Sequence, residues 1–217
     1  MQLIFEQLRT GGDRNFGYLI ADREAAQGVL VDPSYDPELL VERAAAQGIT
    51  VTAILNTHGH PDHTNGNSRA VEITSAPVAA HPDAPTPPTR ALADREELTV
   101  GSVTLRCLYT PGHSVDHIVL YEPTHRFLVT GDLLFVGKVG GAQTDEDARI
   151  EWASLQRVLS EVPDDTTVWP GHDYGVRPSS TIGLERRTNP FLAVEDVEKF
   201  LERRREWPEF KKRHGLK

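Results

Sequence analysis

One short stretch of the chain, HGHPDH at residues 58–63, combines three histidines with one acid. Neutral imidazole offers a nitrogen lone pair and carboxylate offers oxygen, so such a cluster suits a divalent metal ion. The candidate ligands are His58, His60, Asp62 and His63. A catalytic zinc ion usually takes three protein ligands and keeps a fourth position for water. Four candidates on one loop therefore suggest that they are shared between two adjacent ions.

Three further candidate ligands each follow an apolar run and a glycine. His113 lies in YTPGHS, Asp132 in LVTGDLLF and His172 in VWPGHDYG. Loops at the ends of strands commonly carry functional side chains. A structural role explains most lone histidines, but here it would have to explain four segments with one shared arrangement. We predict that these residues meet the HGHPDH loop at a metal centre.

The remaining histidines carry weaker signals. We interpret His117 as a structural neighbour of the centre, while His125 lies in an expected turn and His214 in the tail. The role of His81 stays open.

These loops require strands that end beside one another. Brief apolar or β-branched runs bounded by Gly, Pro, Asn or Asp predict strands over Leu3–Leu8, Phe16–Ala21, Gly28–Asp32, Val51–Asn56, Pro77–Ala80, Val103–Tyr109, His117–Tyr121, Arg126–Thr130 and Thr167–Trp169. Helices are expected over Pro37–Gln47 and Arg149–Val162, and a last one from Asn189 as cap and Pro190 as first residue. Interleaved helices and strands indicate an α/β fold, and hairpin-like strand pairs indicate mixed sheets.

Composition excludes several classes of function. The formal net charge of −9 over 217 residues opposes general binding to nucleic acid or to an anionic membrane surface. No run reaches the roughly 18 apolar residues of a membrane span. The first residues lack the basic start and long apolar core of a secretory signal, so we expect a cytoplasmic protein. The single cysteine, Cys107, lies in a predicted strand and is interpreted as core packing.

In this order and spacing, the HGHPDH motif followed by PGH, GD and a second PGH resembles the metallo-β-lactamase superfamily, from about Phe5 to Leu192. The resemblance implies a four-layer αββα sandwich with mixed sheets and with metal ions between the sheet edges. We expect a catalytic domain over residues 1–190 and a helical C-terminal appendage packed on it over residues 191–217.

Carried over by position, the resemblance implies two divalent metal ions, of zinc, or of iron or manganese. The first would be bound by three histidines, His58, His60 and His113. The second would be bound by Asp62, His63 and His172, with Asp132 bridging the two. Asp62 and Asp132 are the residues implied in catalysis as well as in metal binding.

Within the superfamily the chain is most similar to glyoxalase II-like thioesterases, on the segments NTHGHPDHTNGN, TGDLLFVG and STIGLERRTNPFL. The resemblance implies hydrolysis of an acyl thioester, with a glutathione thioester as one candidate, by a metal-bridging hydroxide, while the ions polarise the carbonyl. A thiolate leaves readily, so no protein nucleophile is required. Such an enzyme would need neither nucleic acid nor membrane and would be a monomer or a homodimer.

Two departures concern the substrate. Only about 45 residues follow His172, whereas full-length glyoxalase II enzymes carry a larger helical region that helps to hold glutathione. Gly141, in GKVGGAQTDED, stands where relatives often have an arginine that contacts a substrate carboxylate. Lys138 could replace that charge and Tyr174 could hydrogen-bond the thiol moiety; for each, a surface or packing role is the alternative.

Other functions stay open. The segments FGYLIADREAAQGVLVDP and GHDYG also resemble persulfide dioxygenases of the same superfamily, in which two histidines and a carboxylate hold a single iron. His58, His113 and Asp132 would form that triad. Lactone hydrolysis and a metal-binding module without catalysis are further alternatives.

Overall fold

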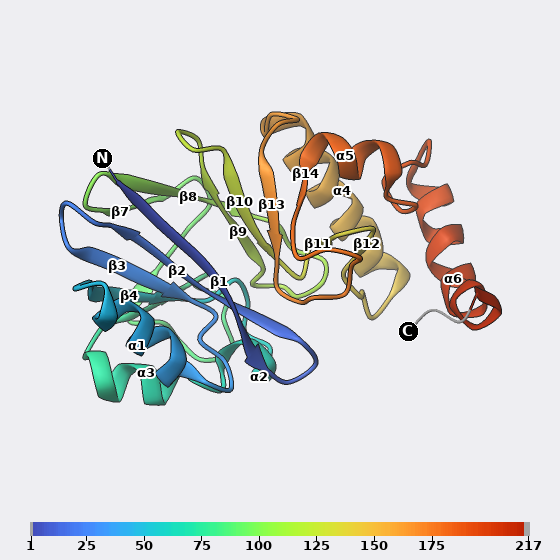
Figure 1. Cartoon of the computed structure of the whole chain (residues 1–217). Coiled ribbons are helices and arrows are strands. Elements are labelled where there is room, and N and C mark those ends of the chain that lie inside the picture. The colour runs from blue at the N-terminus through green and yellow to red at the C-terminus, as the bar shows by residue number, and fades with distance from the viewer. Residues whose placement is uncertain (1, 215–217) are drawn as a thin grey trace.

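Apolar alternation along the strands builds two mixed six-stranded sheets that pack face to face in the computed structural model, which describes residues 2–214 (Figure 1). The first sheet has its strands in chain order: β1 (Leu3–Gly11), β2 (Asn15–Asp22), β3 (Gln27–Val31), β4 (Thr50–Leu55), β5 (Val78–Ala80) and β6 (Arg90–Ala91). The pairs from β1 to β3 are antiparallel, and those from β3 to β6 are parallel.

The second sheet runs in the order β14-β13-β10-β9-β8-β7. Its strands are β7 (Glu97–Val100), β8 (Val103–Tyr109), β9 (Ile118–Glu122), β10 (Phe127–Gly131), β13 (Thr167–Pro170) and β14 (Ser180–Thr181). Only β10 and β13 pair in parallel. Strands β11 (Leu134–Phe135) and β12 (Lys138–Val139) form a separate small hairpin beside the site.

Helices cover the outer face of each sheet, which completes the predicted αββα arrangement (Figure 1). On the first sheet lie α1 (Pro37–Ala46) and α3 (Asn67–Thr74), and on the second lie α4 (Asp145–Glu161), α5 (Ile182–Thr188) and α6 (Val197–His214). A single helical turn, α2 (Pro61–Thr64), belongs to the candidate site.

Alternation along β8 shows how the layers are held. Val103, Leu105 and Cys107 point into the core between the sheets, whereas Leu108 joins the outer cluster under α4. All five residues of β10 are buried because this central strand is covered on both faces.

The predicted start of the last helix was wrong. Asn189 is the C-cap of α5, and its backbone N–H donates to the carbonyl of Glu185. Its side-chain amide donates to the carbonyl of Lys138 and to the Glu185 carboxylate. Its side-chain oxygen accepts from the backbone N–H of Phe191, as that of an N-cap would. Residues 190–192 nevertheless form only a turn, and α6 begins at Val197.

The C-terminal helix α6 packs on α4. Phe200 and Leu201 are fully buried in the same apolar cluster as Leu155 and Leu159. The division into residues 1–190 and 191–217 stays a prediction.

Within residues 2–214, none of the helices has both the length and the apolar character that a membrane crossing demands.

Candidate metal centre

Strand ends bring the predicted ligands together. Strands β8, β10 and β13 run in the same direction, since β9 is antiparallel to both β8 and β10 and β13 is parallel to β10. Their carboxyl ends therefore meet at one edge of the second sheet. His113, Asp132 and His172 follow these ends, and the HGHPDH loop follows β4 of the facing sheet.

Helix α2 sets the direction of two ligands. His60 is its N-cap residue and Pro61 takes the first helical position, so Asp62 and His63 lie in the first turn. The turn that begins at Pro61 is therefore helical.

A first group of donors contains three imidazole nitrogens. Nδ1 of His60 lies 3.0 Å from Nε2 of His58 and 3.0 Å from Nε2 of His113. Ligand atoms of a tetrahedral ion with bonds of 2.0–2.1 Å are about 3.3 Å apart, close to this spacing. The group matches the predicted first set.

A second group contains Asp62, His63 and His172. Nε2 of His172 lies 3.2 Å from Nε2 of His63 and 3.4 Å from Oδ2 of Asp62. The third side of this triangle, from His63 Nε2 to Asp62 Oδ2, measures 3.8 Å. The group matches the predicted second set.

Asp132 lies between the two groups. Its Oδ2 is 3.6 Å from Nε2 of His113 and 3.4 Å from Nε2 of His172, and its Oδ1 is 3.4 Å from Nε2 of His63. One carboxylate therefore faces ligands of both groups, as a bridging ligand would.

In four of the histidines, the ring nitrogen Nδ1 is already hydrogen-bonded outside the two groups. Thr57 Oγ1 donates to Asp32 and so accepts from Nδ1 of His58, 3.1 Å away. Nδ1 of His63 bonds to Asp32 Oδ2 at 2.9 Å. Nδ1 of His113 and of His172 bond to backbone carbonyls at 2.7 and 2.9 Å. In the neutral rings these bonds leave each Nε2 bare and directed into the centre.

This donor set fits a divalent metal ion. His60 Nδ1 carries at most one proton, so it cannot hydrogen-bond to the bare nitrogens of both His58 and His113. Oδ1 of the buried Asp132 also has no hydrogen-bond partner among the described residues. A bound cation satisfies all of these atoms, and buried charged or polar groups are rarely left unpaired.

The histidines of the centre differ in pKa, because burial lowers the pKa and neighbouring carboxylates raise it. Burial lowers the pKa of His58 well below its ordinary value, and burial likewise lowers that of His113. Burial also disfavours a charged His172, yet its hydrogen bonds to Asp132 and Asp62 raise its pKa to about 9. For His63, burial is outweighed by Asp132 and Asp32, which raise its pKa well above the ordinary value. The centre is thus already arranged to hold positive charge beside Asp132.

Sequence reasoning missed Asp32, which orients two ligands. Its carboxylate accepts from the backbone N–H and hydroxyl of Thr57 and contacts His63, and all three residues are buried. The available signal was an acid directly after the apolar run VLV, at the end of β3. That position places it level with the end of the parallel neighbour β4.

His117 is a structural neighbour, as predicted. Its Nε2 accepts from the backbone N–H of Asp132 at 3.1 Å, and its Nδ1 bonds to Thr110 Oγ1 at 2.8 Å. Both ring nitrogens are used, so His117 fixes the backbone of Asp132. His81 instead stacks on Tyr109, with ring centroids 4.2 Å apart.

A cleft of about 480 Å³ opens onto the centre at His113 and Asp132. Lys138 and Tyr174 both line it, with the Lys138 ammonium 4.3 Å from the Tyr174 ring centroid. Lys138 forms no ion pair among the described residues. The Tyr174 hydroxyl donates to Asp13 Oδ2 at 2.8 Å, and its ring stacks on His172. Gly141 lies at the rim of the cleft, with open space where a side chain would project.

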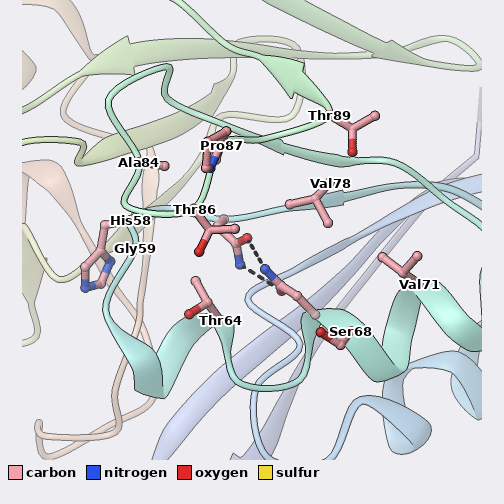
Figure 2. Close-up of a pocket in the computed structure, with 13 residues that line it drawn as sticks. His58, Gly59, Thr64, Ser68, Val71, Val78, Ala84, Thr86, Pro87 and Thr89 are labelled. Carbon is pink, nitrogen blue, oxygen red and sulfur yellow. Dashed lines mark hydrogen bonds between the residues drawn. The ribbon is translucent and has the colours of Figure 1, made fainter.

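A second cavity, of about 440 Å³, lies on the other side of the HGHPDH loop, towards α3 and β5 (Figure 2). Figure 2 shows His58 and Gly59 at one end and Thr64, Val78 and Thr86 around it. Among the described residues that line this cavity, His58 alone has a titratable side chain. The cleft at Asp132 therefore suits a substrate of the metal centre better.

Comparison with protein families identifies one match over most of the chain. Residues 10–172 match the model of the Metallo-beta-lactamase superfamily. This range contains all seven predicted ligands and ends at His172.

Relatives of known name carry similar sequences. A hydroxyacylglutathione hydrolase from Polaromonas sp. (strain JS666) is 38% identical over 178 residues, which cover 79% of this chain and 67% of that protein. A second hydroxyacylglutathione hydrolase, from Nitrosococcus oceani, is 34% identical over the same shares of the two chains.

Solved structures share the fold. ETHE1 from Myxococcus xanthus superposes with a TM-score of 0.85 at 32% identity, covering 92% of this chain and 89% of that one. A protein solved in a di-iron-bound form superposes with a TM-score of 0.72 at 34% identity, covering 86% of this chain and all of the other.

Proposed function

The chain belongs to the metallo-beta-lactamase superfamily, and from that premise we propose that it is a binuclear metallohydrolase that cleaves an acyl thioester. The observation that carries the proposal is the position of Asp132 between two three-ligand groups. The convergence of Asp62, His63 and His172 as a second group favours two ions over one.

Bound divalent ions supply an acidified water as nucleophile at neutral pH and polarise the carbonyl that it attacks. The chain's own residues supply the geometry. The first group (His58, His60 and His113) and the second group (Asp62, His63 and His172) would hold the ions, with Asp132 between them. Asp62 and Asp132 would provide the compensating negative charge, and His117 keeps the Asp132 backbone in place. The leaving thiolate is stable at neutral pH, so the centre needs no protein nucleophile.

The cleft favours an anionic substrate. Burial lowers the pKa of Lys138, and the nearby charge of Lys211 lowers it further, so the Lys138 ammonium gains from an anionic neighbour. The named relatives hydrolyse hydroxyacylglutathione. We assign Lys138 to a carboxylate of a glutathione-type thioester, and Tyr174 to the wall beside the thiol, with its hydroxyl oxygen as an acceptor.

Metal content and thiol release test the proposal together. The protein as purified should hold about two ions per chain, and a hydroxyacylglutathione should release free thiol with it. The His172→Ala variant should lose most of that activity and about one ion, since it breaks the second group. Two ions with no thiol release from any thioester tried would contradict the proposed reaction.

A second candidate, a mononuclear iron persulfide dioxygenase, is favoured by the likeness to ETHE1 from Myxococcus xanthus. Its triad would be His58, His113 and Asp132, with His113 and Asp132 3.6 Å apart. Oxygen consumption with glutathione persulfide, one iron per chain, and a His172→Ala variant that keeps its rate would establish this reaction in place of hydrolysis.

A further inference from the structure

An ion pair between α4 and α6 lies directly behind the metal centre. The Glu151 side chain is fully buried, and Arg204 Nη1 lies 2.7 Å from its Oε2. Burial pushes the pKa of Glu151 upward, and the Arg204 guanidinium opposes that rise. Buried ion pairs are often no more stabilising than apolar residues of similar size. A positional role accounts for the pair better than stability does.

The same guanidinium holds the backbone of a loop. Arg204 Nη1 donates to the carbonyl of Gly140 at 2.9 Å, and Nη2 donates to the carbonyl of Ala142 at 3.4 Å. Between these two residues, Gly141 directs its carbonyl at Nδ1 of His113, 2.7 Å away. The chain of contacts runs from the C-terminal helix to a predicted metal ligand.

The same loop also lies against the backbone of Asp132. A Cβ at Gly140 would lie 2.0 Å from the backbone oxygen of Asp132 and 3.1 Å from Nδ1 of His113. The Gly140 backbone N–H donates to the carbonyl of Leu133. Only a glycine permits this close approach, so a shift of the loop would move its contacts with both ligand residues.

We propose that Arg204 is a positioning residue of the metal centre. From α6 it fixes the carbonyls of Gly140 and Ala142, so that the Gly141 carbonyl holds the His113 ring with the proton on Nδ1 and Nε2 bare. The inference rests on metal binding at the His58, His60 and His113 group and is independent of which reaction the centre catalyses.

The test variant combines Arg204→Leu with Glu151→Leu. Arg203→Leu is its control. Removing both charged partners avoids leaving a buried carboxylate unpaired. Arg203 is the preceding residue of the same helix and lines only a surface hollow formed by α6. Arg203→Leu therefore controls for the loss of a positive charge from α6.

Zinc titration against a competing chelator, in the His172→Ala background, isolates the first group. Loss of a partner that orients a ligand costs roughly 10- to 100-fold in metal affinity, and we expect a loss in that range for the double variant and none for Arg203→Leu. In the metal-free protein, NMR of the imidazole nitrogens should show one fixed tautomer for His113 in the parent and Arg203→Leu. It should show averaged tautomers in the double variant.

Equal zinc affinities and one His113 tautomer in all of these proteins would overturn the inference. If the double variant does not fold, Arg204→Lys decides instead. Lysine keeps a positive charge for Glu151, but one ammonium cannot replace a planar fork that reaches two carbonyls and a carboxylate. A several-fold loss of zinc affinity supports the inference and an unchanged affinity overturns it. Absence of thiol release in every variant would contradict only the proposed thioesterase.

Discussion

Oδ2 of Asp132 lies 3.4 Å from Nε2 of His172, although 40 residues separate the two along the chain. The parallel pairing of β10 with β13 sets this distance, because both side chains leave the same edge of one sheet. The same oxygen faces His113 after β8. Strand pairing in the second sheet thus places the Asp132 carboxylate beside the imidazoles of His113 and His172.

Asp132→Asn should remove most of the bound metal. Asparagine keeps the shape of the side chain but brings no negative charge. Its N–H₂ is a donor, so it cannot replace a carboxylate oxygen as a metal ligand beside the imidazoles. Loss of an outer partner that only orients a ligand costs roughly 10- to 100-fold in metal affinity, and we expect a greater loss here, with activity lost alongside. Elemental analysis of purified protein measures the change. Asp165→Asn, an exposed acid paired with Arg126, is the control and should keep its metal.

Asp32→Asn should weaken metal binding without changing any ligand. The substituted amide can still accept from Thr57, but it no longer holds a proton on His63 Nδ1 by charge, and so the His63 ring is less firmly oriented. We expect roughly 10- to 100-fold lower affinity. Chelator competition gives the value, and an affinity within about twofold of the parent would show that Asp32 does not orient His63 for metal.

The convergence of the predicted ligands could be expected from the sequence because each side chain is tied to a strand end. The HGHPDH loop and the segments around His113, Asp132 and His172 each carry a local signal, an apolar run followed by a turn. Strands running in one direction then make their ends meet. The fold class, and the convergence of the predicted ligands at one sheet edge, followed from these local patterns and from the resemblance that they carry.

The supporting residues could not be predicted in this way. Arg204 reaches Glu151 across 53 residues, and Asp32 reaches His63 across 31. Each contact exists only after two elements have packed, and an arginine in a charged helix looks like any solvated one. Asn189 is a different case, because the local signal is present and the helix is not. Its side-chain oxygen accepts from the backbone N–H of Phe191, as in a helix cap, but the chain forms only a turn there.

Cys107 should be inert in the folded protein. It faces the core between the sheets, and burial raises its pKa to about 12, so almost no thiolate is present at about pH 8. A thiol reagent at that pH should label less than about one chain in ten within an hour, and all chains after unfolding in guanidinium. Rapid labelling of the native protein would show that β8 opens, or that the side chain is not packed as described.

Gly141→Arg should improve the use of anionic thioesters. A Cβ at this position meets no atom within 4 Å, so the larger side chain can extend over the cleft without strain, on the same side as Lys138. A charge at the rim of a solvated site contributes about 0.2–1 kcal/mol, which corresponds to about a 1.4- to 5-fold gain in kcat/KM for a glutathione thioester.

Gly141→Gln is the matched control for Gly141→Arg, since it adds comparable length without charge. The gain should appear in the ratio of kcat/KM between an anionic thioester and a neutral one of the same acyl group. It should also fade as salt is raised, because exposed charges are screened over about 10 Å at 0.1 M salt. An equal gain in the glutamine variant, or a gain that salt does not reduce, would mean that packing at the rim and not the added charge selects the substrate.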